Sequence, residues 1–180
     1  DDDFHFQMNI NVYGPFRITK AFAPLIIAEE GRFTTIGSIA GTGTWPGLSA
    51  YSMTKHSMEA FNDAFAAEMA PQGVIVNIVE PGNYKSKISA SLKQRAIDQL
   101  LATGKELTAE EQEFVDSPLN DRSQFKEPDE VAAAVLLALF DENPKPRYMV
   151  VPNEDEARMT ISKAIREVVQ LNADQAYTYD

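Results

Sequence analysis

A tyrosine and a lysine four residues apart are the first side chains in this sequence that could do chemistry. Tyr51 and Lys55 form a Y-x-x-x-K pattern, and on a helix that spacing puts both side chains on one face. A free phenol has a pKa of about 10 and is a poor base at neutral pH. An ammonium group close by favours the phenolate and lowers that pKa. The pair would therefore supply an acid or a base that works near neutrality.

The pair needs a helix to hold it, and a nearby strand offers a third polar group. Apolar residues recur at helical spacing over 50–69, and Ser49 is expected to cap that helix through its hydroxyl. The run 32–37 is rich in β-branched residues and predicts a buried strand. Ser38 follows that strand, at the edge where open α/β sheets place their ligands, and its hydroxyl could polarise a carbonyl oxygen. The alternative is that Ser38 only caps a loop.

The remaining elements alternate along the chain. The pattern predicts, in order, helix 11–30, strand 32–37, helix 50–69, strand 74–82, a polar excursion 83–127, a helix from Pro128, strand 147–151 and helix 155–172. Strands that alternate with helices indicate βαβ units, and hence an α/β fold with a doubly wound parallel sheet.

Three glycines before the tyrosine suggest a different function, a phosphate-binding loop. Gly37, Gly41 and Gly43 follow the strand at 32–37. A dinucleotide fingerprint requires the last glycine to open a helix and an acid to end the next strand. Here the helix begins only near Ser49, and the acid at a fitting distance, Glu59, falls inside that helix. The context therefore argues against a phosphate loop.

Composition excludes several classes of function. The chain has 180 residues, 44% of them hydrophobic, which suits one domain with a real core. A net charge of −11 would repel nucleic acid and anionic membrane surfaces, and no apolar run approaches the length of a membrane span. There is no cysteine and there are only two histidines, so a zinc site is not expected. The lack of cysteine fits a reducing compartment, and we expect a cytoplasmic protein.

Several short motifs together resemble one enzyme family. Asn11-Val12-x-Gly14, Ser38, Tyr51-x-x-x-Lys55 and Pro81-Gly82 resemble the catalytic half of the short-chain dehydrogenases/reductases (SDR). The intervals fit as well, with 27 positions from Asn11 to Ser38 and 13 from Ser38 to Tyr51. The resemblance implies a single partial Rossmann-like domain that corresponds to the C-terminal portion of that fold.

The resemblance implies catalytic roles for four residues. Tyr51 would be the general acid/base, and Lys55 would lower its pKa and bind the ribose hydroxyls of the nicotinamide nucleotide. Ser38 would hold the oxygen of the substrate carbonyl or alcohol. Asn11 would kink its helix and hold a water that relays protons to Lys55. Asn11 could instead be a helix N-cap, which is a common role for asparagine.

The resemblance also implies cofactor contacts and a substrate lid. Pro81 and Gly82 would lie against the nicotinamide, although the pair could be an ordinary turn. The family often has threonine four residues after that glycine, and here Ser86 stands in its place with the same donor group. The excursion 83–127 would be the lid.

The activity implied is hydride transfer between NAD or NADP and a small-molecule ketone or secondary alcohol, and the apolar residues of the excursion 83–127 favour an apolar one. The helices at 13–30 and 50–70 would build a homo-oligomer. In the family, most of the cofactor site precedes the helix that carries Asn11. We therefore expect these 180 residues alone to bind NAD(P) weakly or not at all. The alternative is a truncated, inactive SDR-like fragment that acts as a binding or assembly module.

Overall fold

A computed structural model describes residues 2–118 and 122–179 of the chain. The chain divides into two compact units. The first combines Asp1–Gly82 with Asp129–Asp180, and the second is Asn83–Pro128. The sheet and most of the predicted site residues belong to the first unit.

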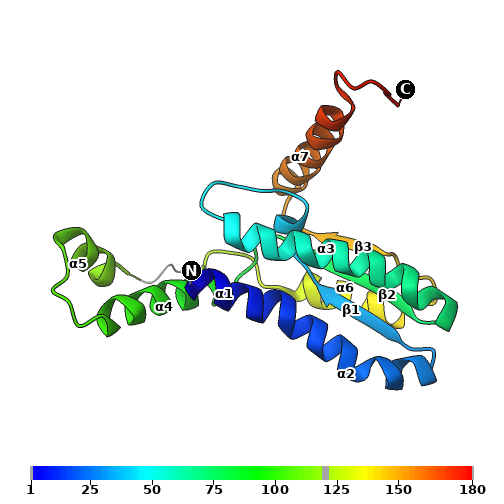
Figure 1. Ribbon diagram of the computed structural model, residues 1–180, viewed down its shortest axis with the longest axis horizontal. Coiled ribbons are helices and arrows are strands. Elements are labelled where there is room, and N and C mark those ends of the chain that lie inside the picture. The colour runs from blue at the N-terminus through cyan, green and yellow to red at the C-terminus, as the bar shows by residue number, and fades with distance from the viewer. Residues whose placement is uncertain (1, 119–121, 180) are drawn as a thin grey trace. The chain divides into compact units, whose positions relative to one another are not determined.

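The first unit contains a parallel sheet of three strands, as the alternating pattern predicts (Figure 1). Its strands are β1 (Arg32–Ile36), β2 (Ile75–Pro81) and β3 (Arg147–Val150), in the order β1-β2-β3. The central strand β2 is buried along most of its length, because helices cover both faces of a parallel sheet. Within the described residues β1 pairs only with β2 and forms an edge of the sheet.

The helical segment before β1 begins earlier than the predicted helix 11–30 and ends at Ala28, whereas the helix after β1 agrees with the predicted 50–69 to within one residue. Before β1 the chain forms α1 (Asp2–Met8), a π-helical turn (Asn9–Tyr13) and α2 (Gly14–Ala28). After β1 it forms α3 (Ser49–Met69). The predicted cap at Ser49 is wrong. The N-cap is Leu48, whose carbonyl accepts from the backbone N–H of Ser52 at 2.7 Å, so Ser49 is already the first helical residue.

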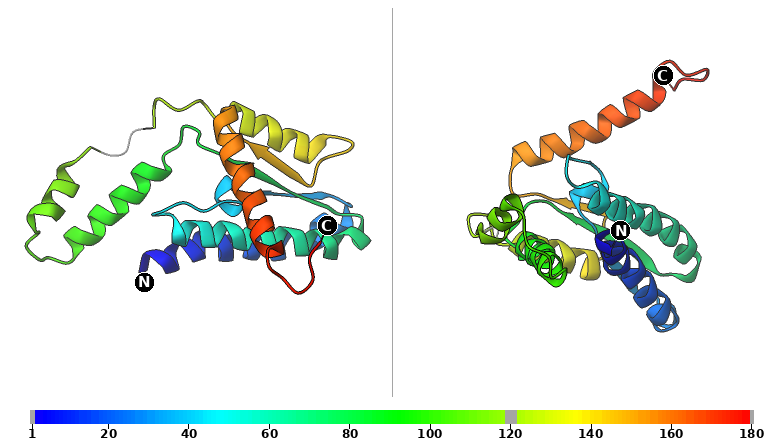
Figure 2. Two further views of the ribbon diagram at one scale, coloured as in Figure 1. Left: turned by 90° about the horizontal axis from the view of Figure 1, so that it is seen from above. Right: turned by 60° about the vertical axis from the view of Figure 1, so that its left-hand side comes forward.

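Two apolar layers hold the helices on the sheet, and β2 supplies both of them. On one face Val76 packs with Phe65 of α3, and side chains of α2 pack around them. On the other face Val79 packs against Ala134 and Ala138 of α6 (Asp129–Phe140). The sheet thus lies between α6 on one side and α2 with α3 on the other, as the left view of Figure 2 shows. Alternation along the strand makes this possible, because successive side chains point to opposite faces.

The last helix of the first unit, α7 (Glu154–Asn172), follows β3, and the Asn153 side chain caps it by accepting from the backbone N–H of Glu156. The second unit holds α4 (Ile88–Ala102) and α5 (Ala109–Asp116). Its bounds fall close to those of the predicted excursion 83–127, whose role as a lid stays a prediction. Among the described helices, none combines the length and the apolar character that crossing a bilayer requires.

Candidate active site

The carboxyl ends of β1 and β2 bring several predicted site residues to one edge of the sheet. Ile36, the last residue of β1, is in register with Val79, and the N–H of Gly37 donates to the Val79 carbonyl at 2.8 Å. The loop that begins at Ser38 therefore starts beside the end of β2, where Pro81 and Gly82 follow. Open α/β sheets bind their ligands at this edge.

Ser38 is buried, with 8% of its surface exposed, and it caps a short 3-10 turn over Ile39–Gly41. Its Oγ accepts a hydrogen bond from the backbone N–H of Ala40 at 3.1 Å. Ser38 therefore does cap a loop, as the alternative interpretation predicts. Its hydroxyl proton takes no part in that hydrogen bond. A serine hydroxyl carries one proton as well as its acceptor lone pairs, so Ser38 can also donate to a ligand oxygen.

Tyr51 and Lys55 lie together on α3, as the helical spacing predicts. The Lys55 ammonium stands over the Tyr51 ring, 5.7 Å from its centroid, which is a favourable cation–π geometry. The same ammonium donates to the carbonyl oxygen of Ile36 at 3.1 Å. Burial lowers the pKa of Lys55, and the nearby carboxylate of Glu59 opposes that change. A cation is thus fixed between a phenol and the end of β1.

Asn11 lies inside the π-helical turn and is linked to the tyrosine helix. The turn's N-cap is Met8, so the alternative that Asn11 is a helix cap is wrong. Its side-chain amide donates to Oγ1 of Thr54 at 3.1 Å, and that hydroxyl donates to the carbonyl of Tyr51 at 2.7 Å. Single π-turns inside α-helices occur often at functional sites. Here the turn directs the amide at the helix that carries Tyr51.

Pro81 is the last residue of β2 and Gly82 follows it, next to β3 and the start of α7. The N–H of Gly82 donates to the Val150 carbonyl at 2.8 Å. A Cβ at this position would overlap Oε1 of Glu156, so a larger residue would displace that carboxylate. Ser86 belongs to the second unit, and its predicted cofactor contact stays a prediction.

The glycines before Tyr51 have a packing role. A Cβ at Gly37 would lie 2.8 Å from Ile78, and one at Gly41 would lie 3.0 Å from the carbonyl of Lys55. Both residues therefore let the loop after β1 approach β2 and α3 closely. The helix that follows begins at Ser49, as expected from the sequence, and not at the last glycine. Close approach explains these glycines without a bound phosphate.

Comparison with known proteins identifies the family. A family model described as enoyl-(acyl carrier protein) reductase, one of the SDR models, matches residues 1–144. The chain belongs to the short-chain dehydrogenase/reductase family. The fold agrees, since an SDR structure from Streptomyces avermitilis aligns with a TM-score of 0.64 and 24% identity over 97% of this chain and 59% of its own. An SDR from Burkholderia cenocepacia in complex with NADP aligns with a TM-score of 0.66 and 19% identity, over 98% and 63%.

Curated SDR relatives match over part of their length. The 11-beta-hydroxysteroid dehydrogenase type 2 of Oryctolagus cuniculus is 31% identical over 153 residues, which is 78% of this chain and 37% of the relative. The mitochondrial D-beta-hydroxybutyrate dehydrogenase of Rattus norvegicus is 41% identical over 86 residues, 48% of this chain and 25% of the relative. The chain thus spans less than half the length of these curated relatives.

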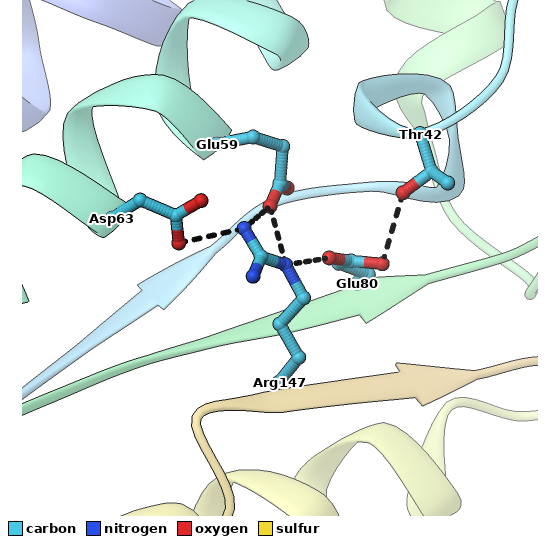
Figure 3. A network of polar contacts seen from close by, with 5 residues as sticks. All are labelled: Thr42, Glu59, Asp63, Glu80 and Arg147. Carbon is cyan, nitrogen blue, oxygen red and sulfur yellow. Dashed lines mark hydrogen bonds and ion pairs between the residues drawn. The ribbon is translucent and has the colours of Figure 1, made fainter. Parts of the chain in front are cut away.

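Sequence reasoning missed a partly buried charge cluster beside these residues. Arg147 of β3 reaches three carboxylates, which Figure 3 shows around its guanidinium. Its Nε lies 3.2 Å from both Glu59 and Glu80, and its terminal nitrogen lies 2.8 Å from Asp63. Thr42 donates to the far oxygen of Glu80 at 3.3 Å. A signal existed in the sequence, because Glu80 is a lone acid in an apolar strand and a buried acid needs a partner.

The cluster gives folding stability a specific dependence on pH. Burial, together with the charge of Glu80, raises the pKa of Glu59 from its usual 4.5 to about 7, against the opposing pull of Arg147. A carboxyl with a raised pKa in the folded state stabilises the fold fully below pH 4.5. That contribution is lost as the pH rises through 7.

We expect Glu59→Gln, which mimics the protonated acid, to leave stability nearly unchanged at pH 4.5. At pH 8 it should raise stability relative to the original protein by on the order of 2 kcal/mol. Urea unfolding across this range measures the difference. A difference between the two proteins that does not change with pH would contradict the expectation.

Proposed function

We propose that this protein transfers a hydride between NAD or NADP and a ketone or secondary alcohol, with Tyr51 as the general acid/base. The observation that carries the proposal is the position of the Lys55 ammonium, 5.7 Å from the Tyr51 ring centroid and bonded to the last carbonyl of β1. A cation held there favours the phenolate and brings the tyrosine into its working range. Membership of the SDR family supports the same reaction.

In the reducing direction, a proton leaves the Tyr51 hydroxyl for the carbonyl oxygen of the substrate. Ser38 donates a hydrogen bond to that oxygen, where negative charge develops, and such donors stabilise the transition state. Asn11 steadies the first turn of α3 through Thr54. When NAD(P)H is bound, its nicotinamide supplies the hydride that reaches the carbonyl carbon.

The donors present fit a nicotinamide nucleotide. We propose that Lys55 contacts ribose hydroxyls, since an ammonium with three donors suits paired hydroxyl acceptors. Pro81 and Gly82, at the same sheet edge, would lie at the nicotinamide. The Burkholderia cenocepacia structure named above is itself a complex with NADP.

We propose a small apolar carbonyl or alcohol as the substrate class. The names of two relatives, a hydroxysteroid and a hydroxybutyrate dehydrogenase, describe proteins that act on hydroxylated compounds. The proposal includes assembly through α2 and α3. Large apolar side chains are exposed along α2, with exposed fractions of 50% at Phe16, 53% at Phe22 and 63% at Leu25.

Isotope transfer tests the reaction directly. The purified protein, at the full length its gene encodes, is incubated with NADH or NADPH deuterated at C4 and a panel of apolar ketones. Deuterium is expected at the carbinol carbon of the alcohol. In the same assay Ser38→Ala is expected to lower turnover by about 100-fold or more, the usual cost of one lost donor to a developing oxyanion. Absence of deuterium with both cofactors would refute the proposal.

A further inference from the structure

One carboxylate, Glu59, lies one turn beyond Lys55 on α3, against the backbone of the Ser38 loop. A Cβ at Gly37 or at Gly41 would lie 2.9 Å from its Oε1, so the carboxyl contacts the chain on both sides of Ser38. Only 13% of its side chain is exposed. Glu59 is therefore a buried acid packed between the lysine helix and the loop that follows β1.

The carboxylates near Glu59 outnumber the cations that contact them. The guanidinium of Arg147 serves Glu59, Glu80 and Asp63 at once, as the dashed contacts in Figure 3 show. Asp63 is exposed to water over 61% of its side chain, whereas Glu80 is exposed over only 5%. Two buried carboxylates thus depend on one partly shared cation, and like charges that close disfavour joint ionisation.

The two buried carboxyls are also near each other. Each has an oxygen 3.2 Å from the same Nε of Arg147, so their charges would repel each other if both carboxyls were ionised. Oε1 of Glu59 is buried and accepts from no N–H or O–H group in residues 2–118 and 122–179. A proton on the Glu59 carboxyl would relieve the repulsion between the two acids.

We propose that Glu59 and Glu80 hold one shared proton, whose loss adds a negative charge behind Lys55, and that Glu59 is a positioning residue for the Tyr51–Lys55 pair. The role given to Lys55 rests on the proposed function. The shared proton does not, because it is argued from the burial of Glu59 and Glu80 and from their contacts with Arg147.

The charged groups that face Glu59 come from three elements. Lys55 and Asp63 lie one turn to either side of it on α3, Glu80 reaches it from β2, and Arg147 reaches it from β3. Burial lowers the pKa of Lys55, and the negative charge of Glu59 raises it. When Glu59 is protonated, its negative charge no longer raises the pKa of Lys55. Once the proton leaves, the ammonium is stabilised and can hold the phenolate of Tyr51.

The first measurement follows the proton itself. Carbon-13 NMR of the glutamate side-chain carboxyls is recorded against pH on the purified, glutamate-labelled protein. We expect one carboxyl to titrate near neutral pH in the original protein and in Asp63→Asn. That titration should vanish in Glu59→Gln. In Glu80→Gln it should move at least one pH unit lower, since the like charge is gone. Asp63→Asn is the control, because it changes another partner of Arg147 on α3 and leaves Glu59 and Glu80 in place.

The second measurement follows Lys55. Competitive labelling with acetic anhydride across pH, read by mass spectrometry of the peptide that contains Lys55, reports its pKa. Glu59→Gln is expected to lower that pKa by about one unit, and Asp63→Asn is expected to leave it unchanged. A Lys55 pKa equal in both variants, or a neutral titration that survives Glu59→Gln, would overturn the proposal. If Glu59→Gln does not fold, a neutral titration that persists in Glu80→Gln decides against it. None of these readouts uses turnover, so a failure of the dehydrogenase assignment would be seen separately.

Discussion

Tyr51→Phe lowers the turnover of ketone reduction by about 100-fold to 10,000-fold, which is the usual range for the loss of a positioned general acid. The substitution removes a single oxygen and keeps the ring over which the Lys55 ammonium lies. The cation, the Ser38 hydroxyl and the carbonyls at the sheet edge remain. The loss should therefore fall on the proton-transfer step, while nucleotide affinity stays nearly intact.

Two measurements on the same variant separate chemistry from binding. Steady-state turnover with NADPH and a ketone gives the catalytic loss, and fluorescence titration with NADPH gives the dissociation constant. Tyr177→Phe is the matched control, because Tyr177 is 95% exposed and far along the chain from the site. Activity of Tyr51→Phe within a few-fold of the original would refute the assignment of Tyr51.

Arg147→Ala is expected to cost about 3 kcal/mol of folding free energy at pH 8, near the lower end of the range for breaking a buried ion pair. The lower end applies because 42% of the Arg147 side chain is exposed. Its removal leaves Glu59 and Glu80 facing each other without a cation. Arg147 lowers the pKa of Glu59, so its loss should raise that pKa further. Protonation of Glu59 would then remove the repulsion between the two carboxylates.

The cost of this substitution should therefore shrink as the pH falls toward 5. Urea unfolding at pH 5 and pH 8 measures both values. Arg158→Ala supplies the comparison, since Arg158 pairs with Glu154 at exposed fractions of 71% and 82% and such pairs contribute only about 0.3 to 0.5 kcal/mol. A loss for Arg147→Ala as small as that of Arg158→Ala, or one equal at both pH values, would show that the buried carboxylates do not depend on Arg147.

The local pattern of the sequence was enough to predict the strands of the sheet and the proximity of Tyr51 and Lys55 on α3. Alternating runs predicted three parallel strands, and a four-residue spacing predicted that Lys55 would lie beside Tyr51. Both predictions depend on the local side-chain periodicity of the backbone, which is about 2 residues in a strand and about 3.6 residues in a helix. The cap at Ser49 failed by one residue, because the exact start of a helix depends on how the loop before it packs.

The sequence marked Glu80 as an acid that needs a partner, but it could not identify that partner, because the members of the cluster lie far apart in sequence. Glu59 and Arg147 are separated by 88 positions, and Glu80 and Arg147 by 67. Parallel strands join such distant segments only through register and crossover connections, which no local pattern specifies. The pairing of Asn11 with Thr54 has the same origin, since a π-turn sets the direction of the amide.

By itself the sequence determined that this is an α/β protein with a phenol and an ammonium on one helical face, because spacing along a helix fixes direction. Only the tertiary structure decided what surrounds that pair. Burial and the approach of two strands placed Glu59 behind Lys55, set its pKa near neutrality and gave it one shared guanidinium. Local geometry is encoded within a few residues, whereas electrostatic environment depends on which distant segments exclude water together.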